Sequence, residues 1–272
     1  ESQLLAEVGD ADVVVFVGGI SPSLEGEEMK VSEPGFKGGD RTDIELPQAQ
    51  RKVMEMLHRA GKRVVFVNCS GSAIAMVPET ENAESILQAW YPGERGGEAV
   101  AKVLFGEVNP SGKLPVTFYK STSDLPDFLD YTMKNRTYRY FKGEALFPFG
   151  HGLSYTSYEY GKPALKKVKN SSAYSLSFSL SNKGNREGTE VAQVYIKRMG
   201  DVEGPIKTLK AFKRITLKAG EKQQVTISLP RQSFEGWDSQ TNTMRVVPGK
   251  YQLFVGGSSA EAAKNVIEVK VK

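Results

Sequence analysis

The sequence has little of the chemistry that metal, redox and nucleophilic sites require. It contains one cysteine, Cys69, and two histidines, His58 and His151, among 272 residues. A single cysteine forms neither an internal disulfide nor a metal-binding pair, and two separated histidines supply too few ligands for a transition metal. We therefore predict a small buried residue at Cys69 and no metal site.

Motifs for nucleotide binding and serine hydrolysis are also missing. Residues 18–23 read GGISPS, which is not the GxGxxG of a dinucleotide site, and residues 71–73 lack the lysine of a phosphate loop. Residues 68–72 read NCSGS, which is not the G-x-S-x-G of a serine hydrolase. These absences argue against both classes of protein.

No run of about 18 apolar residues is present, so no transmembrane helix is predicted. A hydrophobic fraction of 39% and a charged fraction of 25% are typical of a folded globular protein. The net charge of +4 is spread along the chain, and the densest basic stretch, residues 166–169, is short and lacks aromatic residues. We therefore expect neither nucleic acid nor a membrane as a partner.

The first part of the chain alternates between strand and helix patterns. Residues 13–17 (VVVFV) and 63–68 (RVVFVN) are short apolar runs rich in β-branched residues, which are typical of strands buried on both faces of a parallel sheet. Residues 46–60 read as a helix, with Pro47 in its first turn and Gly61 at its end. This alternation predicts a layered α/β domain.

From about residue 160 the pattern changes to short segments in which apolar and polar residues alternate. Such segments, separated by turn signals, predict an antiparallel β-sandwich. They are residues 174–180, 191–196, 224–229 and 251–255. We therefore predict an α/β domain at residues 1–135, a connector at 136–160 and a β-sandwich at 161–272.

The best candidate site is the loop that leaves the first strand, because ligands of open α/β sheets bind beyond the carboxyl ends of the strands. This loop contains Glu25, Glu27 and Glu28 and, further on, Asp40 and Arg41. A solvated acidic loop is the alternative interpretation, since carboxylates are common in ordinary loops.

Glycosidic cleavage is a reaction that such a loop could serve. It needs one carboxylic acid that protonates the leaving oxygen and a second carboxylate that acts as nucleophile or base. The proton donor must stay protonated near neutral pH, which requires partial desolvation or a neighbouring negative charge. The crowding of Glu25, Glu27 and Glu28 raises the electrostatic cost of ionising all three.

Several segments together resemble glycoside hydrolase family 3, the β-glucosidases and β-xylosidases. Residues 90–99 read WYPGERGGEA, residues 109–118 read NPSGKLPVTF, and residues 147–156 read FPFGHGLSYT. The resemblance covers nearly the whole chain. It implies a layered α/β sandwich domain followed by an all-β fibronectin type III-like sandwich.

The resemblance also implies parts that this chain lacks. In the family, the two domains follow a barrel that supplies the nucleophilic aspartate and most of the sugar-binding subsite. The chain opens with Glu1 inside a predicted helix, so we expect its start to be cut and the strand at residues 13–17, or its neighbour, to be an exposed edge. The chain alone is expected to be inactive.

The family's acid/base is a glutamate on the loop after such a strand, followed by an aspartate-arginine pair. The resemblance implies Glu27 as the acid/base, with Glu28 as the runner-up and Glu25 third. Many members run straight on to the Asp-Arg pair, whereas residues 29–39 intervene here. Asp40 and Arg41 either hold the loop in place as an ion pair or contact the substrate directly.

We assign the other motifs to the fold rather than to chemistry: residues 90–97 and 109–118 provide a tight turn, a helix start and a strand entry. A group of aromatic residues in and near the connector either packs between the domains or lines a sugar subsite. Its members are Tyr138, Tyr140, Phe141, Phe147 and Phe149.

The expected function is that of the C-terminal part of a retaining exo-β-glycosidase that removes terminal β-linked glucose or xylose from oligosaccharides or glycosides. Its expected partners are the glycoside substrate and the N-terminal barrel of the same enzyme. No metal or organic cofactor is implied, and the intact enzyme is expected to be secreted or periplasmic. The alternative is a non-catalytic carbohydrate-binding or structural module.

Overall fold

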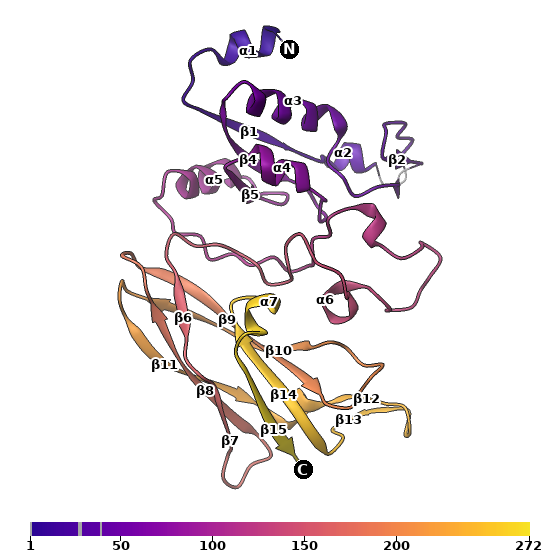
Figure 1. Cartoon of the computed structure of the whole chain (residues 1–272), viewed down its shortest axis with the longest axis vertical. Coiled ribbons are helices and arrows are strands. Elements are labelled where there is room, and N and C mark those ends of the chain that lie inside the picture. The colour runs from indigo at the N-terminus through magenta and orange to yellow at the C-terminus, as the bar shows by residue number, and fades with distance from the viewer. Residues whose placement is uncertain (1, 27–28, 39) are drawn as a thin grey trace. The chain divides into compact units, whose positions relative to one another are not determined.

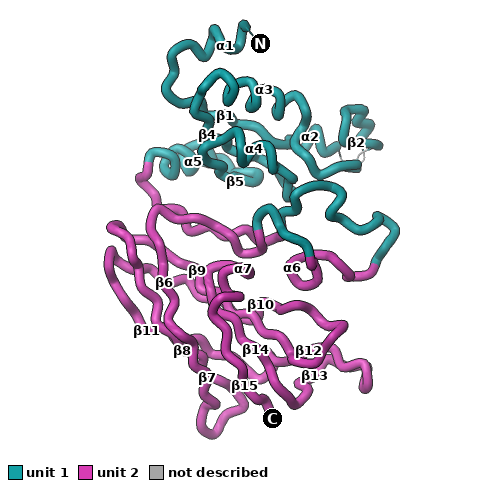
Figure 2. Tube along the Cα trace, viewed as in Figure 1, with its two compact units in different colours: residues 1–105, 118–131, 143–147 teal, residues 106–117, 132–142, 148–272 magenta. Residues whose placement is uncertain are grey.

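The computed structural model describes residues 2–26, 29–38 and 40–272, and its backbone divides into two compact units (Figures 1 and 2). Unit 1 has α/β organisation and unit 2 is dominated by antiparallel strands, as the sequence predicts. Unit 1 comprises residues 1–105, 118–131 and 143–147, and unit 2 comprises residues 106–117, 132–142 and 148–272. The chain therefore passes between the units several times before residue 148.

Unit 1 is built on a three-stranded parallel sheet in the order β1-β4-β5. The predicted strands at residues 13–17 and 63–68 pair side by side, from Val13 opposite Arg63 to Gly19 opposite Cys69. The helices and strands of this unit are α1 (Ser2–Val8), β1 (Val13–Gly19), α2 (Pro22–Glu25), β2 (Phe36–Lys37), β3 (Asp40–Arg41), α3 (Gln48–Arg59), β4 (Arg63–Cys69), α4 (Val77–Asn82), β5 (Ser85–Gln88), α5 (Gly96–Leu104) and the short 3-10 helix η1 (Thr122–Asp124).

Helix α3 covers one face of this sheet and contacts both β1 and β4. Its side chains Met54 and Leu57 are buried, as are Val64 and Phe66 of β4. The Phe16 ring of β1 lies 5.8 Å from that of Phe66. The apolar residues of the predicted helix therefore face the sheet, and their burial fixes the direction of β1.

The opposite face of β1 is open. Val13, Val15 and Val17 are 41%, 50% and 65% exposed, because α3 covers the face that carries Phe16 and Gly18 and no described element covers the other. The prediction of a strand buried on both faces is therefore wrong for β1 in this chain. The expectation of an exposed edge is confirmed, since β1 is the outer strand of the described sheet.

Unit 2 contains a sandwich of two antiparallel sheets, β10-β9-β14-β15 and β11-β8-β6, with β7 also paired to β8. Its core draws alternate residues from both sheets, among them Leu176, Phe178, Val194, Leu217 and Leu253. The strands and helices of this unit are α6 (Thr137–Tyr140), β6 (Tyr158–Tyr160), β7 (Ala164–Lys167), β8 (Tyr174–Asn182), β9 (Gly188–Arg198), β10 (Thr208–Leu217), β11 (Lys222–Leu229), η2 (Arg231–Phe234), β12 (Gly236–Asp238), β13 (Thr243–Arg245), β14 (Gly249–Gly256), α7 (Ser259–Ala262) and β15 (Val266–Val271).

The motifs at residues 109–118 and 147–156 meet within unit 2. The Leu114 amide donates to the His151 carbonyl and the Gly150 amide donates to the Leu114 carbonyl, both at 2.8 Å. Gly152 and Gly112 approach so closely that a Cβ on Gly152 would collide with the Gly112 carbonyl oxygen. The two motifs therefore act here through backbone pairing.

An aromatic group from the predicted set packs on β9. The Tyr138 and Phe149 rings stack with their centroids 4.2 Å apart, and both meet the buried Tyr195 edge-on. The Tyr138 hydroxyl also accepts a hydrogen bond from the Leu209 amide at 3.0 Å. These contacts within unit 2 account for the placement of Tyr138 and Phe149 by packing.

Candidate functional site at the carboxyl ends of the strands

The exit from β1 is fixed by Gly19 and by a side chain of α3. The Gln50 amide mimics a neighbouring strand: its Oε1 accepts from the Gly19 amide at 2.8 Å and its Nε2 donates to the Gly19 carbonyl at 2.7 Å. Gly19 has φ of 122°, and a Cβ there would collide with the Cys69 carbonyl oxygen. Only glycine fits this close approach, so the acidic loop leaves the sheet in one direction.

Strands β4 and β5 are joined at the same edge by buried polar side chains. Asn68 donates to the Gln88 Oε1 at 2.6 Å and to the Ser70 Oγ at 3.2 Å. Gln88 in turn donates to Ser70, whose hydroxyl donates to the Ser72 carbonyl at 2.9 Å. Because buried polar groups need partners, this network holds the loops after β4 and β5 in a defined position.

The acidic loop begins with one turn of helix, α2. Ser21 caps this helix by accepting from the Leu24 amide, and Pro22 occupies its first position. The helix ends at Gly26, which has the left-handed φ of 62° and lies so close to Val31 that a Cβ would collide with it. Gly26 therefore sets the direction of the chain just before the predicted acid/base.

The leading candidates for the acid/base, Glu27 and Glu28, lie outside the described residues. The chain on both sides of them is described: Gly26 precedes them, and the Met29 amide donates to the Gly26 carbonyl at 2.8 Å. The third candidate, Glu25, is described and is the last residue of α2.

Glu25 meets Tyr91, a residue that we assigned only to the fold. The Tyr91 ring and the Glu25 carboxylate both lie beside Gly71. A Cβ on Gly71 would lie 2.7 Å from the Tyr91 ring and 3.3 Å from a Glu25 carboxylate oxygen. Burial, together with the nearby Glu25 carboxylate, raises the pKa of Tyr91 to about 12, so its hydroxyl keeps its proton.

Arg41 is the second described residue of the predicted site, and its guanidinium is held by neighbouring loops. Nη1 donates to the Ser72 hydroxyl at 3.2 Å and Nη2 to the Glu45 carbonyl at 3.1 Å. Burial lowers the pKa of Arg41, while the charges of Asp43 and Glu25 oppose that shift. These contacts support the loop-holding interpretation, and a direct contact between Arg41 and substrate stays a prediction.

The Asp40–Arg41 segment is the second strand of a small hairpin, β2–β3. The residues that separate it from the acidic run fold back, so that Lys37 pairs with Asp40 and Phe36 pairs with Arg41. Phe36 is buried, and the Arg41 guanidinium lies 5.9 Å from its ring centre. Asp40 is exposed, and among the described residues no ion pair joins it to Arg41. A role for Asp40 in binding substrate stays a prediction.

The end of the loop is fastened by Glu45, which sequence reasoning did not single out. Its carboxylate accepts from the Thr122 amide at 3.0 Å and hydroxyl at 2.6 Å, and from the Ile44 amide at 3.0 Å. Burial acts to raise the pKa of Glu45, but these hydrogen bonds outweigh it and the pKa lies below its usual range. Glu45 is therefore an anchor for the loop.

Tyr91 is presented by an unusual backbone. The preceding residue, Trp90, has φ of 57°, which is rare for a bulky side chain. The Trp90 ring packs edge-on against the buried Phe118, with centroids 6.1 Å apart. Such conformations persist where the surroundings hold them and often occur at functional sites. The Trp-Tyr-Pro-Gly motif was the signal that could have pointed to Tyr91.

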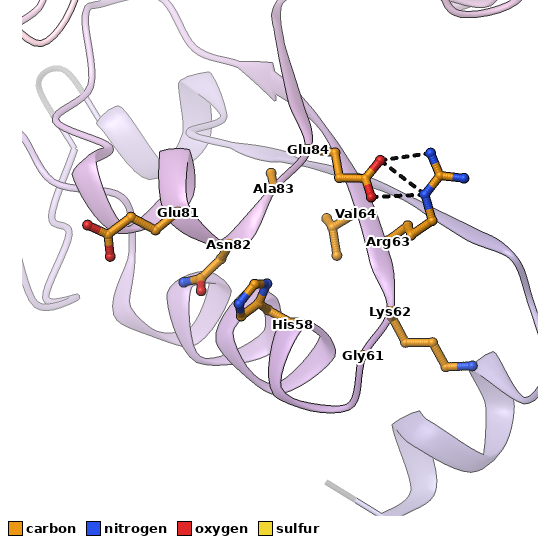
Figure 3. Close-up of a pocket in the computed structure, with 9 residues that line it drawn as sticks. All are labelled: His58, Gly61, Lys62, Arg63, Val64, Glu81, Asn82, Ala83 and Glu84. Carbon is orange, nitrogen blue, oxygen red and sulfur yellow. Dashed lines mark hydrogen bonds and ion pairs between the residues drawn. The ribbon is translucent and has the colours of Figure 1, made fainter.

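A hollow of about 250 Å³ lies elsewhere in unit 1, at the amino ends of β4 and β5 (Figure 3). Arg63 there forms a two-pronged ion pair with Glu84, at 2.8 to 3.1 Å. The charges of Arg63 and Glu84 are thus paired with each other, and the hollow lies at the opposite end of the strands from the acidic loop. The lining residues are His58, Gly61, Lys62, Arg63, Val64, Glu81, Asn82, Ala83 and Glu84.

The described residues contain neither a metal-binding cluster nor a membrane-spanning helix. No group of three His, Cys, Asp or Glu side chains within residues 2–26, 29–38 and 40–272 could hold a metal ion. None of the helices in this part of the chain combines the length and the apolar character needed to cross a membrane.

Two family models match this chain. Residues 1–155 match the glycosyl hydrolase family 3 C-terminal domain, and residues 190–259 match a fibronectin type III-like domain. An α/β domain with a glutamate-rich loop at its strand ends, followed by such a sandwich, defines the class: the C-terminal portion of a glycoside hydrolase. The chain belongs to glycoside hydrolase family 3.

Individual relatives cover nearly all of the chain. It is 52% identical over 259 residues to a xylan 1,4-β-xylosidase of Xylanibacter ruminicola, a match that covers 95% of this chain and 30% of that protein. It is 34% identical to a periplasmic β-glucosidase of Salmonella typhimurium, over 95% of this chain and 34% of that one. The chain thus spans about a third of the length of these curated relatives.

Solved structures share the fold of this chain. A β-glucosidase from Kluyveromyces marxianus in complex with glucose superposes with a TM-score of 0.86 at 30% identity, covering 100% of this chain and 33% of that one. A β-glucosidase from Erythrobacter marinus has a TM-score of 0.80 at 34% identity, over 99% of this chain and 35% of that one. The predicted family and fold class are therefore confirmed.

Proposed function

We propose that the protein to which this chain belongs is a retaining exo-β-glycosidase, and that this chain supplies its general acid/base. The observation that carries the proposal is the acidic segment at the carboxyl end of β1, which begins directly after Gly26. Ser21 and Gly26 cap α2, and Gly26 packs against Val31, so the segment starts from an ordered base. A proton donor needs such an ordered start, because it must lie within hydrogen-bond reach of the leaving oxygen and point toward it.

Glu27 is the proposed acid/base, with Glu28 as the runner-up. Glu25 lies with Tyr91 beside Gly71, and its negative charge acts on the nearby Arg41. These interactions suit a carboxylate that serves as an anchor. Glu27 follows two residues later, next to Glu28, and neighbouring negative charge favours the protonated form that an acid requires.

The reaction then proceeds in two steps. An aspartate from the N-terminal barrel of the intact enzyme attacks the anomeric carbon while the Glu27 carboxylic acid gives its proton to the departing glycosidic oxygen. The Glu27 carboxylate next takes a proton from water, whose oxygen displaces the aspartate from the same carbon. Retention requires the two carboxyl groups to lie about 5–5.5 Å apart.

Xylose is the proposed terminal sugar, with glucose as the second choice. The support is the 52% identity to a protein named xylan 1,4-β-xylosidase, against 34% for one named periplasmic β-glucosidase. The second name also supports a periplasmic or secreted location. The proposed substrate is a β-linked oligosaccharide or glycoside with an accessible non-reducing end.

The test uses the intact protein and the variants Glu27→Gln, Glu28→Gln and Glu25→Gln. Loss of the acid should lower kcat/KM for xylobiose by about 10²–10⁴-fold. The same loss should lower the release of dinitrophenol from dinitrophenyl β-xyloside far less, because dinitrophenolate departs without protonation. We expect only Glu27→Gln to show this large loss on xylobiose with a small loss on the dinitrophenyl β-xyloside. Added azide should restore turnover by Glu27→Gln, because azide attacks in place of the water that the glutamate would activate.

Other outcomes decide between the candidates. The same split in Glu28→Gln would move the role by one residue. If all three variants keep turnover and lose only affinity, the loop belongs to a non-catalytic carbohydrate-binding module, and the proposal is wrong.

A further inference from the structure

We propose that a hollow on unit 2 is an additional binding site for a neutral, β-linked oligosaccharide. The hollow has a volume of about 400 Å³, which lies within the range of small-molecule sites, roughly 300–1,000 Å³. The choice of a β-linked chain rests on the proposed function, whereas the class of ligand follows from the lining. Six polar side chains line the hollow, all from unit 2 (Figure 2): Glu107, Asn109, Arg186, Glu187, Thr189 and Thr216.

The turn that carries Arg186 and Glu187 is held by a buried amide. Asn182, the last residue of β8, is 1% exposed. Its Nδ2 donates to the Arg186 carbonyl at 2.8 Å and to the Leu217 carbonyl at 3.1 Å, and its Oδ1 accepts from the Gly184 amide at 3.0 Å. The turn between β8 and β9 is therefore tied to the end of β10, so this wall of the hollow has a defined shape.

Asn109, the first residue of the NPSGKLPVTF motif, joins this turn to the following connector. Its Nδ2 donates to the Glu187 carbonyl at 2.9 Å, and its Oδ1 accepts from the Ser154 hydroxyl at 2.9 Å and from the Tyr155 amide at 2.8 Å. A Cβ on Gly188 would lie 2.7 Å from the Asn109 Nδ2, so the close crossing of these segments needs a glycine. The base of the hollow is therefore assembled before any ligand binds.

The Arg186 guanidinium is oriented and still has donors to offer. Nη2 donates to the Gly106 carbonyl at 2.8 Å, and the guanidinium carbon lies 5.3 Å from the centre of the Tyr155 ring, within the range of a cation–π contact. An arginine side chain carries five N–H donors. Because the Gly106 carbonyl is its one hydrogen-bond acceptor among the described residues, the other N–H groups of Arg186 are available to a ligand.

The hollow also supplies acceptors and hydroxyl groups. Glu107 and Glu187 are exposed, and neither carboxylate has a hydrogen bond or an ion pair within the described part of the chain. Thr189 of β9 and Thr216 of β10 lie opposite each other, with their hydroxyl oxygens 2.8 Å apart. One of these hydroxyls donates to the other, so the pair keeps one donor and several lone pairs.

This lining favours a neutral ligand that is rich in hydroxyl groups. Two carboxylates and one guanidinium give a net charge of −1, which repels an anion. No large apolar side chain lines the hollow, so an apolar ligand gains nothing there, and the described residues hold no metal-binding cluster. A sugar hydroxyl both donates and accepts, so it can bond to a carboxylate and a guanidinium together. Such a site would raise the concentration of substrate chains around the enzyme.

The experiment titrates thio-linked xylotriose and thio-linked cellotriose into the intact protein by calorimetry, because sulfur linkages resist hydrolysis. One test variant, Glu107→Ala/Glu187→Ala, removes both carboxylates. The other, Thr189→Val/Thr216→Val, removes both hydroxyls but keeps the shape and the strand preference of the side chains. Glu203→Ala is the matched control, since Glu203 is an exposed residue of unit 2 outside the hollow. Thermal unfolding shows which variants are folded, and a folded double variant decides the question if the other is unstable.

We expect wild type and Glu203→Ala to bind two equivalents of trisaccharide, one at the acidic-loop site and one at the hollow. Each double variant should bind the second equivalent about tenfold or more weakly, because hydrogen bonds to the ligand are lost. The trisaccharide that supplies this second equivalent identifies the chain as xylose- or glucose-based. A single equivalent in wild type, or a second equivalent that either double variant binds as tightly as wild type, would overturn the inference.

The two proposals fail separately. Glu27→Gln is assayed on xylobiose, and full turnover by that variant would refute the proposed acid without affecting the second equivalent of trisaccharide. Absence of the second equivalent would refute the hollow as a sugar site and leave the result for Glu27→Gln unchanged.

Discussion

The ion pair between Lys113 and Glu190 permits a quantitative prediction about unit 2. Their charged atoms lie 3.3 Å apart, and the two side chains are only 15% and 5% exposed. Lys113 also donates to the Gly152 carbonyl at 3.1 Å, and the Tyr160 hydroxyl donates to Glu190 at 3.0 Å. Lys113 belongs to the NPSGKLP motif, so this pair fastens that motif to the sandwich.

Removing Lys113 and removing Glu190 should lower the free energy of unfolding by different amounts. Lys113→Met leaves Glu190 buried with one hydroxyl partner, which should destabilise unit 2 by about 3 kcal/mol, the lower end of the range for a broken buried pair. Glu190→Gln leaves Lys113 with the Gly152 carbonyl and some access to water, so we expect about 1–2 kcal/mol. The double variant leaves no unpaired charge and should lose less than the sum of the two.

Thermal unfolding of the intact protein, followed by a probe in the sandwich, measures these effects. For a domain of this size 1 kcal/mol corresponds to roughly 2–4 °C, so Lys113→Met should lower the transition by about 6–12 °C. The reasoning is refuted if Lys113→Met changes nothing, or if the double variant loses the full sum.

Three further predictions concern unit 1. Gly71→Ala should lower xylobiose turnover because its Cβ would lie 2.7 Å from the Tyr91 ring, whereas Gly93→Ala, whose Cβ meets open space, should not; steady-state rates check this. Gly97→Ala should stabilise α5 by about 0.5–1 kcal/mol, whereas Gly96→Ala would collide with Pro92 and destabilise it; equal shifts in thermal unfolding would contradict this. Burial raises the pKa of Glu79 in the folded protein. The protonated Glu79 side chain therefore contributes to folding stability below about pH 4.3, the pKa of an unfolded glutamate, and this contribution is lost as the pH rises through the pKa of Glu79 in the folded protein. Glu79→Gln, which mimics the protonated form, should match wild type near pH 4 and be at least as stable at pH 7 by the same assay.

Much of the fold could be predicted because burial leaves a pattern in the sequence. The apolar runs of β1 and β4 and the alternation in β8 and β9 each identify a strand, and Pro47 and Gly61 mark the two ends of α3. The pattern does not say which neighbour covers each face. Val13, Val15 and Val17 look like residues of a doubly buried strand but are exposed in this chain.

The site was less predictable, because its contacts join residues far apart in the sequence. Glu45 is fastened by Thr122, 77 residues away, and Glu25 meets Tyr91 across the ends of three strands. Glu45 has no local pattern that marks it as a partner, and the Trp-Tyr-Pro-Gly motif that contains Tyr91 does not say which residues Tyr91 lies beside. The sequence marks residues 29–39 only as an insertion, whereas Phe36 and Lys37 pair with Arg41 and Asp40 in the β2–β3 hairpin and Phe36 is buried.

The most direct test of the proton-donor role is the mass of Glu27→Gln after mixing the intact variant with dinitrophenyl β-xyloside. An activated leaving group allows the sugar to be transferred to the nucleophile, and the missing base then leaves the sugar in place. We predict that a covalently glycosylated enzyme accumulates, and that azide discharges it as a β-glycosyl azide. A variant that stays unmodified and turns over xylobiose at the wild-type rate would contradict the assignment of Glu27.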